Sequence, residues 1–124
     1  MIYGIGTDIL EVERMSTMIA KGGQYLETIF TKNERDYSGG KSRQAVHYAV
    51  RFAAKEAVLK ALGTGWRDGL AFSDIEILND ELGKPQVFLH GKVRTLFEQL
   101  RIKQISISLS HTQKIALAVV ILEK

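Results

Sequence analysis

Apolar and polar positions alternate along residues 2–10, which predicts a strand with Gly4, Gly6 and Asp8 on one face. Glycine inside a strand marks a bulge or the close approach of another backbone or of a ligand. We favour a ligand beside Asp8. The alternative is tight packing of the glycines against a helix or a second chain.

The rest of the pattern predicts helices and two strand pairs. Helical periodicity covers residues 11–20, 25–30, 34–37 and 91–101, and a longer, largely apolar helix spans 43–62. Strand patterns at 73–78 and 86–90, and at 105–110 and 115–122, indicate two hairpins, with a loop around 66–69. We expect one domain over residues 1–124. Its class is α+β: a mainly antiparallel sheet packed with one long buried helix and several short helices.

Two short patterns refine these predictions. Thr31 and Glu34 have the spacing of a capping box, with Phe30 before it as a core residue. The last strand is apolar on both faces, so both faces need cover. We therefore expect a homo-oligomer whose interface uses the Ser and Ala faces of the final hairpin, at residues 106–110 and 116–118.

The long helix carries charges where a buried helix should be apolar. At about 100° per residue, Glu56 and Lys60 share an apolar stripe, whereas His47, Arg51 and Lys55 form an outward strip. A buried charge without a partner costs several kcal/mol, on the order of the whole stability of a small domain. Position alone leaves two interpretations equal: a functional site, or an i,i+4 pair worth about 0.3–0.5 kcal/mol.

Composition narrows the function classes. Hydrophobic residues make up 45% and charged residues 25%, as in soluble globular proteins, and no apolar run could span a bilayer. The absence of Cys excludes disulfides and Cys-ligated zinc, and residues 1–8 do not resemble a secretory signal. We expect a cytoplasmic protein without a membrane partner. A net charge of +3 with scattered basic residues does not favour a nucleic-acid partner.

Four polar residues are poorly explained by folding alone: Asp8, Glu56, Lys60 and His111. Two carboxylates with open coordination positions suit Mg²⁺, which substrate phosphates commonly complete. Lys60 would then neutralise a phosphate, and His111 would contact phosphate or transfer a proton, unless it is a plain surface residue. The Gly-Thr-Gly run at 63–65 could approach a phosphate, although a helix end is the stronger interpretation.

Four blocks resemble a known family, in order along nearly the whole chain. They are residues 5–9, 30–34, 51–65 and 108–112, and they resemble the signature blocks of the holo-[acyl-carrier-protein] synthase family. That family is the small bacterial branch of the 4'-phosphopantetheinyl transferase superfamily. The resemblance implies that fold and a magnesium-dependent enzyme serving fatty acid biosynthesis. The enzyme would move 4'-phosphopantetheine from coenzyme A to a serine of apo acyl carrier protein and release adenosine 3',5'-bisphosphate.

The resemblance also implies a role for individual residues. Asp8 and Glu56 resemble magnesium ligands, and Lys60 a pyrophosphate contact; Glu56 or a water held by it is the candidate base. A homotrimer with active sites between subunits is implied. The implied nucleotide pocket contains Arg51, Gly63, Thr64, Gly65, Lys84 and Pro85. A neighbouring subunit would contribute a coenzyme A contact through His111 and Thr112. The implied face that docks the carrier protein consists of Arg14, Met18 and Lys21.

The alternative is a non-catalytic oligomeric module that binds acidic helices or nucleotides, in which Glu56 and Lys60 only pair. The sequence leaves open which carrier proteins are accepted, whether acyl-coenzyme A donors serve, and whether manganese replaces magnesium.

Overall fold

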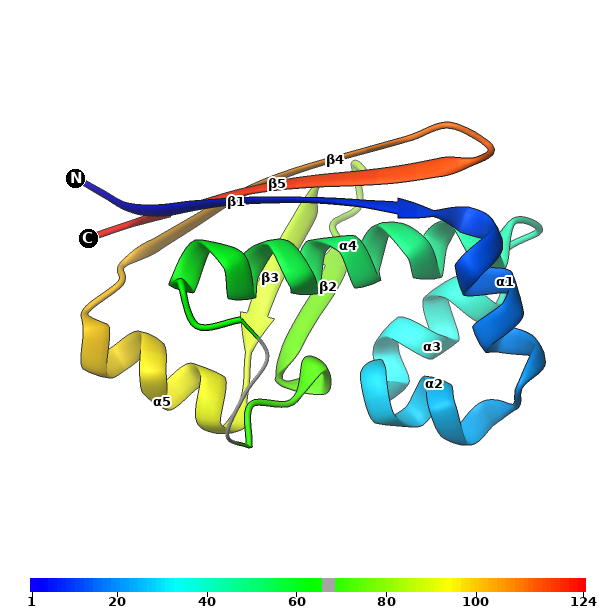
Figure 1. The fold of residues 1–124 in the computed structure, drawn as a ribbon, viewed down its shortest axis with the longest axis horizontal. Helices are drawn as coiled ribbons and strands as arrows, with labels where there is room; N and C mark the ends of the chain where they lie inside the picture. The colour runs from blue at the N-terminus through cyan, green and yellow to red at the C-terminus, as the bar shows by residue number, and fades with distance from the viewer. Residues whose placement is uncertain (66–68) are drawn as a thin grey trace.

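A long helix, α4 (Gln44–Leu62), runs through the middle of the molecule beneath a three-stranded sheet (Figure 1). The computed structural model describes residues 1–65 and 69–124, so most of the predicted loop at 66–69 lies outside the described residues. The other elements, in chain order, are β1 (Ile2–Glu11), α1 (Val12–Ala20), α2 (Gly23–Ile29), α3 (Lys32–Gly39), the 3₁₀ helix η1 (Phe72–Asp74), β2 (Ile75–Asn79), β3 (Pro85–Leu89), α5 (Gly91–Leu100), β4 (Gln104–His111) and β5 (Ile115–Glu123).

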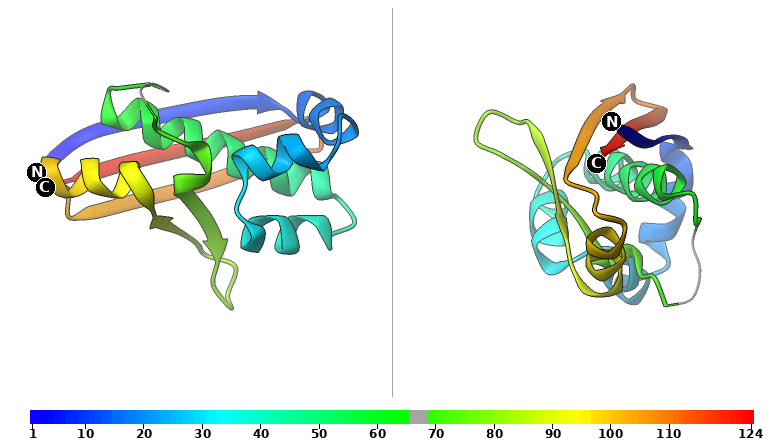
Figure 2. Two further views of the ribbon diagram at one scale, coloured as in Figure 1. Left: turned by 90° about the horizontal axis from the view of Figure 1, so that it is seen from below. Right: turned by 90° about the vertical axis from the view of Figure 1, so that its left-hand side faces the viewer.

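The sheet that covers α4 has the order β1-β5-β4 and is antiparallel throughout. It confirms the first strand and the final hairpin. β5 is the central strand, and its Ala118 pairs with Asp8 on one side and Leu109 on the other. Figure 2 shows the three strands side by side along the length of α4. Asp8 therefore faces the helix from the β1 edge of the sheet.

The other predicted hairpin, at residues 73–90, forms a separate two-stranded ribbon, β2 paired with β3. The predicted start of its first strand was wrong by two residues. Ser73 and Asp74 lie in η1 instead, because the Asp74 N–H donates to the Ala71 carbonyl at 3.0 Å and closes a tight turn. Lys84 lies in the turn between the strands, and Pro85 takes the first position of β3, where a missing N–H is tolerated.

Three short helices follow β1 and pack around the first half of α4. The predicted capping box is confirmed: Thr31 Oγ1 accepts from the Glu34 N–H at 3.2 Å, and the Thr31 N–H donates to Glu34 Oε1 at 2.9 Å. Phe30 is 1% exposed, which confirms it as a core residue. The helix that the box begins runs two residues further at each end than predicted, as α3.

The strand glycines serve packing, so a ligand was the wrong explanation for Gly4 and Gly6, whereas a ligand beside Asp8 stays a prediction. A Cβ on Gly6 would lie 2.0 Å from the Ala57 carbonyl oxygen, and one on Gly4 would lie 2.0 Å from that of Ala61. No side chain fits in that space, so β1 touches the backbone of α4 directly. The alternative stated from the sequence, close packing against a helix, is therefore confirmed.

The charges of α4 are buried on a different side from the one predicted. Arg51 is 1% and Lys55 0% exposed, although both were placed on the outward strip, whereas the Lys60 side chain is 53% exposed. The helix is mostly buried, as expected. A helical projection gives the relative angles of side chains but does not show that α3 and β2 cover the Arg51 and Lys55 flank.

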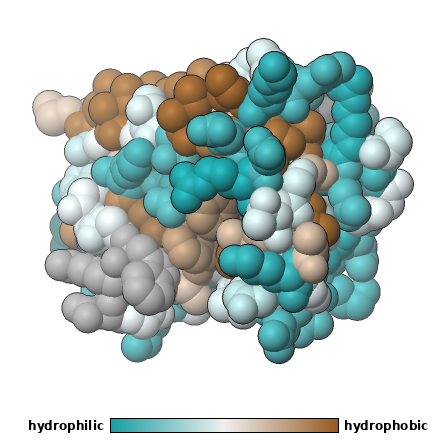
Figure 3. Space-filling model, turned by 45° about the vertical axis from the view of Figure 1, so that its right-hand side comes forward, coloured by the Kyte–Doolittle hydropathy of each residue, from teal (hydrophilic) through white to brown (hydrophobic). Residues whose placement is uncertain are grey.

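The two faces of the final strand have different environments. Ala116 and Ala118 are fully buried on the side of α4, so placing an interface on the Ala face was wrong. The opposite face stays open: Ile5 is 62%, Ile9 64% and Leu117 39% exposed. Figure 3 shows hydrophobic residues gathered along the upper side of the molecule, where this sheet lies. Within the described residues, no helix has the length and hydrophobicity to span a membrane.

Candidate functional site

Three of the predicted site residues meet where β1 crosses α4. Lys60 Nζ donates to Asp8 Oδ1 at 3.0 Å, with the Asp8 side chain 15% exposed. Glu56 lies one helical turn before Lys60, and its carboxylate makes no hydrogen bond or ion pair among the described residues. The predicted i,i+4 pair between Glu56 and Lys60 is therefore not formed, since Lys60 turns to the strand.

The electrostatics confirm that the two carboxylates are neighbours. Burial raises the pKa of Glu56, the negative charge of Asp8 raises it further, and Lys60 opposes the shift. A partly buried carboxylate beside a second carboxylate is unfavourable until a cation balances both. Such perturbed groups are typical of functional sites.

The sequence creates this cluster through small residues. Gly4 and Gly6 let β1 lie against the backbone of α4 at Ala57 and Ala61. Asp8 is the next residue on the same face of β1, and Glu56 and Lys60 flank Ala57 on the helix. The contact between strand and helix therefore determines the separation of the two carboxylates.

The donor set fits magnesium. Asp8 and Glu56 offer carboxylate oxygens from two elements, and Lys60 already places a positive charge at the Asp8 oxygen. Among the described residues, no group of three or more His, Asp and Glu side chains could hold a metal ion. Mg²⁺ is commonly held by one or two carboxylates, with water and substrate phosphates as its other ligands.

α4 ends at Leu62, two residues beyond Lys60, and Gly63 caps it. Gly63 has a φ of 82°, and its N–H donates to the Leu59 and Lys60 carbonyls at 3.2 and 3.0 Å. This confirms the helix-end interpretation of the Gly-Thr-Gly run. Gly65 also has a positive φ, 62°, and Thr64 Oγ1 donates to its carbonyl. The three residues share one end of the helix with Lys60.

Arg51 does not join the Asp8, Glu56 and Lys60 cluster of its own chain. Its guanidinium donates to the Ile77 carbonyl at 3.1 Å, to the His47 carbonyl at 3.2 Å and to Asn79, and it lies 4.4 Å from the centre of the Tyr37 ring. A buried guanidinium with these partners holds β2 to α4. Within one chain α4 turns this side chain away from Glu56, so its place in the nucleotide pocket stays a prediction.

The remaining predicted nucleotide contacts lie on other elements than Asp8, and Ala116 of β5 stands between His111 and Leu10 of β1. His111 and Thr112 are at the β4–β5 turn, and β5 separates β4 from β1. Lys84 and Pro85 are at the tip of the β2–β3 ribbon, which projects beyond β4 in both views of Figure 2. One chain does not bring these residues to Asp8.

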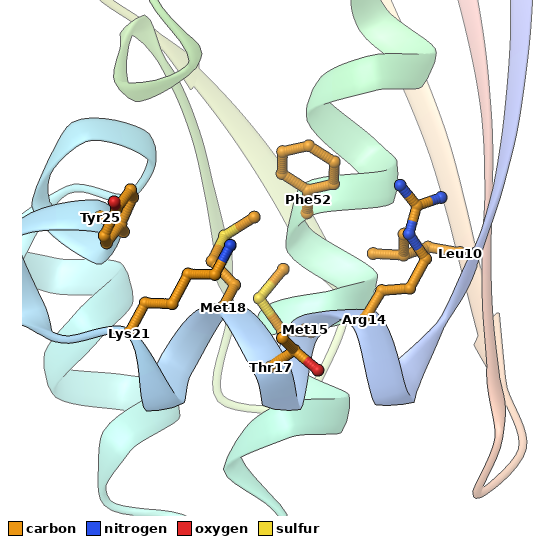
Figure 4. A pocket seen from close by; sticks show the side chains of 8 residues that line it. All are labelled: Leu10, Arg14, Met15, Thr17, Met18, Lys21, Tyr25 and Phe52. Atoms are coloured by element: carbon orange, nitrogen blue, oxygen red, sulfur yellow. The ribbon is translucent and has the colours of Figure 1, made fainter.

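A pocket of about 440 Å³ lies between α1, α2 and α4. Arg14, Met18 and Lys21, predicted as a docking face, line it together (Figure 4). Of the two methionines of α1, Met15 is buried, while Met18 is half-buried at the pocket. The sequence did not identify four other lining residues, Leu10, Thr17, Tyr25 and Phe52.

Phe52 connects this pocket to the carboxylates. It lies on α4 one turn before Glu56, and its spacing of four residues puts it on the same stripe as Glu56 and Lys60. That shared stripe was the available signal. Figure 4 shows Phe52 behind Met18, with Lys21 and Arg14 towards opposite ends of the pocket. Two positive side chains around an apolar floor suit an acidic partner with an apolar anchor.

Comparisons with known proteins agree in family and in fold. A model described as the 4'-phosphopantetheinyl transferase superfamily matches residues 4–120. The chain is 46% identical to a holo-[acyl-carrier-protein] synthase of Geobacter sulfurreducens, covering 100% of this chain and 99% of that one.

Two solved structures are similar over the whole fold. A holo-[acyl-carrier-protein] synthase from Neisseria meningitidis superposes with a TM-score of 0.91 at 39% identity, covering 100% of both chains. A holo-(acyl-carrier-protein) synthase from Bacillus anthracis, in complex with CoA (3',5'-ADP), gives a TM-score of 0.82 at 40% identity, covering 99% of this chain and 97% of that one.

Proposed function

This chain belongs to the 4'-phosphopantetheinyl transferase superfamily, as its sequence blocks predicted, and we propose that it transfers 4'-phosphopantetheine from coenzyme A to a serine of apo acyl carrier protein. The observation that carries the proposal is the cluster of Asp8, Glu56 and Lys60 next to the pocket beneath α1. The products are holo acyl carrier protein and adenosine 3',5'-bisphosphate. We further propose that the protein acts in the cytoplasm and supplies fatty acid biosynthesis, as the family resemblance implies.

Asp8 and Glu56 would hold Mg²⁺, which supplies Lewis-acid stabilisation of phosphate charge when bound. Lys60 is half-exposed on the same helix stripe, so its ammonium can leave Asp8 and pair with a phosphate oxygen. In the reaction, the serine oxygen forms a bond to the β-phosphorus, and the bond to the leaving bisphosphate breaks. Lys60 stabilises the negative charge that builds on the phosphoryl oxygens.

Glu56 is also the candidate base for the serine proton, either directly or through a water that it holds. No other partner holds its carboxylate among the described residues, so it is available for this role.

The pocket lined by Arg14, Met18, Lys21 and Phe52 would bind the carrier protein. Carrier protein surfaces rich in carboxylates would meet the positive side chains, and an apolar side chain would enter between Met18 and Phe52. Since Phe52 is one turn from Glu56, a partner docked here brings its serine towards the carboxylates.

The open face of the sheet would bind further copies of the chain, and we propose a homotrimer with active sites between subunits. Ile5, Ile9 and Leu117 expose an apolar surface that monomeric proteins rarely leave uncovered. A shared site would also give His111 and Thr112 a role. They lie away from Asp8 in their own chain, but a neighbouring chain could present them to coenzyme A.

The direct test is the mass of an apo acyl carrier protein after incubation with this protein, coenzyme A and Mg²⁺. The expected result is the added phosphopantetheine, lost when a chelator removes the metal. No mass gain across several carrier proteins would favour the non-catalytic binding module. That alternative predicted a Glu56–Lys60 pair, which the structure does not contain.

Substitution separates the metal role from the fold. Asp8→Ala and Glu56→Ala should abolish turnover while the circular dichroism spectrum stays native, because neither change removes apolar volume from the core. Glu56→Gln keeps the shape of the side chain and removes its charge. Wild-type turnover in Glu56→Gln would show that Glu56 is not a metal ligand.

A further inference from the structure

A second charged cluster lies on a different flank of α4 and is fully enclosed. Lys55 and Glu34 are both 0% exposed, and Lys55 Nζ lies 2.8 Å from Glu34 Oε1. Burial lowers the pKa of the Lys55 ammonium, and the Glu34 carboxylate opposes that shift. Desolvating two charges is costly, and such a pair is a weak source of stability compared with apolar side chains of similar volume. The transfer mechanism uses neither group.

The Lys55 ammonium ties α4 to three other segments. It donates to Glu34 of α3, to the Phe72 carbonyl of η1 at 3.0 Å and to the Ile75 carbonyl of β2. Glu34 in turn accepts from the Ile77 N–H of β2 at 2.9 Å. One nitrogen atom therefore holds the flank of α4 that faces away from β1.

The Lys55 ammonium is linked to both parts of the candidate site, the carboxylates of Asp8 and Glu56 and the docking pocket. Glu56 follows Lys55 directly, so a rotation of α4 that breaks the Lys55 contacts also moves Glu56 relative to Asp8. The Phe72 ring, whose carbonyl Lys55 holds, packs against Phe52 with ring centroids 5.3 Å apart. Phe52 is the α4 residue that lines the docking pocket.

We infer that Lys55 and Glu34 are positioning residues that set the rotation of α4, so that Glu56 faces Asp8 and Phe52 closes the docking pocket. The close contact of Gly4 and Gly6 fixes the helix from the other side. This inference rests on the proposed function, since it assigns the pair to the two substrate sites of that reaction. A purely structural pair would stabilise the fold without setting either site.

The test compares Lys55→Met, which keeps the length of the side chain and removes its three bonds, with Val93→Ala. Val93 is 0% exposed in α5, which contributes no residue to the site, so its truncation destabilises the core alone. Two quantities are measured per folded molecule: kcat for phosphopantetheine transfer, and the calorimetric Kd for apo carrier protein. Urea unfolding gives the folded fraction of each variant.

For Lys55→Met, kcat should fall on the order of tenfold or more, because small misplacements of catalytic groups are costly. The carrier Kd should rise severalfold, while Val93→Ala leaves both values at wild type. Wild-type kcat and Kd in folded Lys55→Met would overturn the inference. A wild-type protein that binds the carrier but transfers nothing would instead refute the proposed function, and the Kd comparison would still decide the positioning role.

If Lys55→Met does not fold, Lys55→Arg decides the question. Arginine keeps the charge beside Glu34, but a planar guanidinium cannot place one nitrogen among the Glu34, Phe72 and Ile75 oxygens. This variant should fold and show the same two changes to a smaller extent. Wild-type kcat and Kd in Lys55→Arg would then overturn the inference.

Discussion

Gly6→Ala tests whether the contact between β1 and α4 determines the geometry of the site. The new Cβ would lie 2.0 Å from the Ala57 carbonyl oxygen and 2.7 Å from the Ala61 amide nitrogen, both backbone atoms that cannot turn aside. Ordinary contact begins at 3.4 Å, so strand and helix must separate by about 1.4 Å, from 2.0 to 3.4 Å, at this point.

That separation should lower both the stability of the fold and the rate of turnover. Overpacking of this kind destabilises a fold by about 1–3 kcal/mol. Asp8 lies two residues further along the strand and moves with it, away from Glu56 and Lys60. A misplacement of about 1 Å costs on the order of 100-fold in rate, so turnover per folded molecule should fall by about that factor.

The assay combines urea unfolding with the mass-based transfer assay, and Gly23→Ala is the matched control. Nothing lies within 4 Å of a Cβ on Gly23, so this variant should differ from wild type by less than about 0.5 kcal/mol and retain full turnover. A Gly6→Ala protein with wild-type stability and turnover would refute the account of how the carboxylates are placed.

Three further predictions concern docking, pH and assembly. Arg14→Glu at the pocket should raise the carrier KM by up to about tenfold and weaken its salt dependence, leaving coenzyme A binding nearly unchanged; equal loss for both substrates would contradict this. The pKa of His47 is lowered by burial first, and then by Arg51, Lys41 and His111, so the unfolded chain binds more protons as the pH falls. The free energy of unfolding should therefore decrease between about pH 7 and pH 5, and His47→Gln should flatten that dependence in urea titrations; an unchanged slope would remove His47 as the cause. Leu117→Asp on the open sheet face should dissociate the proposed homotrimer and lower turnover, so an unchanged sedimentation mass would show that this face is not the interface.

Elements with strong local signals could be predicted from the sequence. The Thr31–Glu34 capping box, the final hairpin and the Gly63 helix end depend on neighbouring residues alone, and all three are confirmed. The blocks around Asp8 and Glu56 also identified the family correctly. Because the local pattern and the family signature coincide there, the sequence alone was enough to group the two carboxylates.

The wrong predictions concerned residues whose environment depends on elements distant in the sequence. A helical projection gives the angle between Lys55 and Glu56 but not which flank other elements cover, and Lys55 proved to be the fully buried charge. Arg51 was placed on the outward strip for the same reason, since the Ile77 carbonyl and the Asn79 side chain that bind it lie more than 20 residues away in sequence. The role of the glycines also required the position of α4, because an isolated strand does not show what approaches it.

The most direct test of the central claim is the Mg²⁺ dependence of coenzyme A binding, measured by calorimetry on wild type, Asp8→Asn and Glu56→Gln. If both carboxylates hold the metal beside the phosphates, Mg²⁺ should tighten coenzyme A binding to the wild type and have little effect on either variant. Equal tightening by Mg²⁺ in all three proteins would contradict the claim that Asp8 and Glu56 form the metal site.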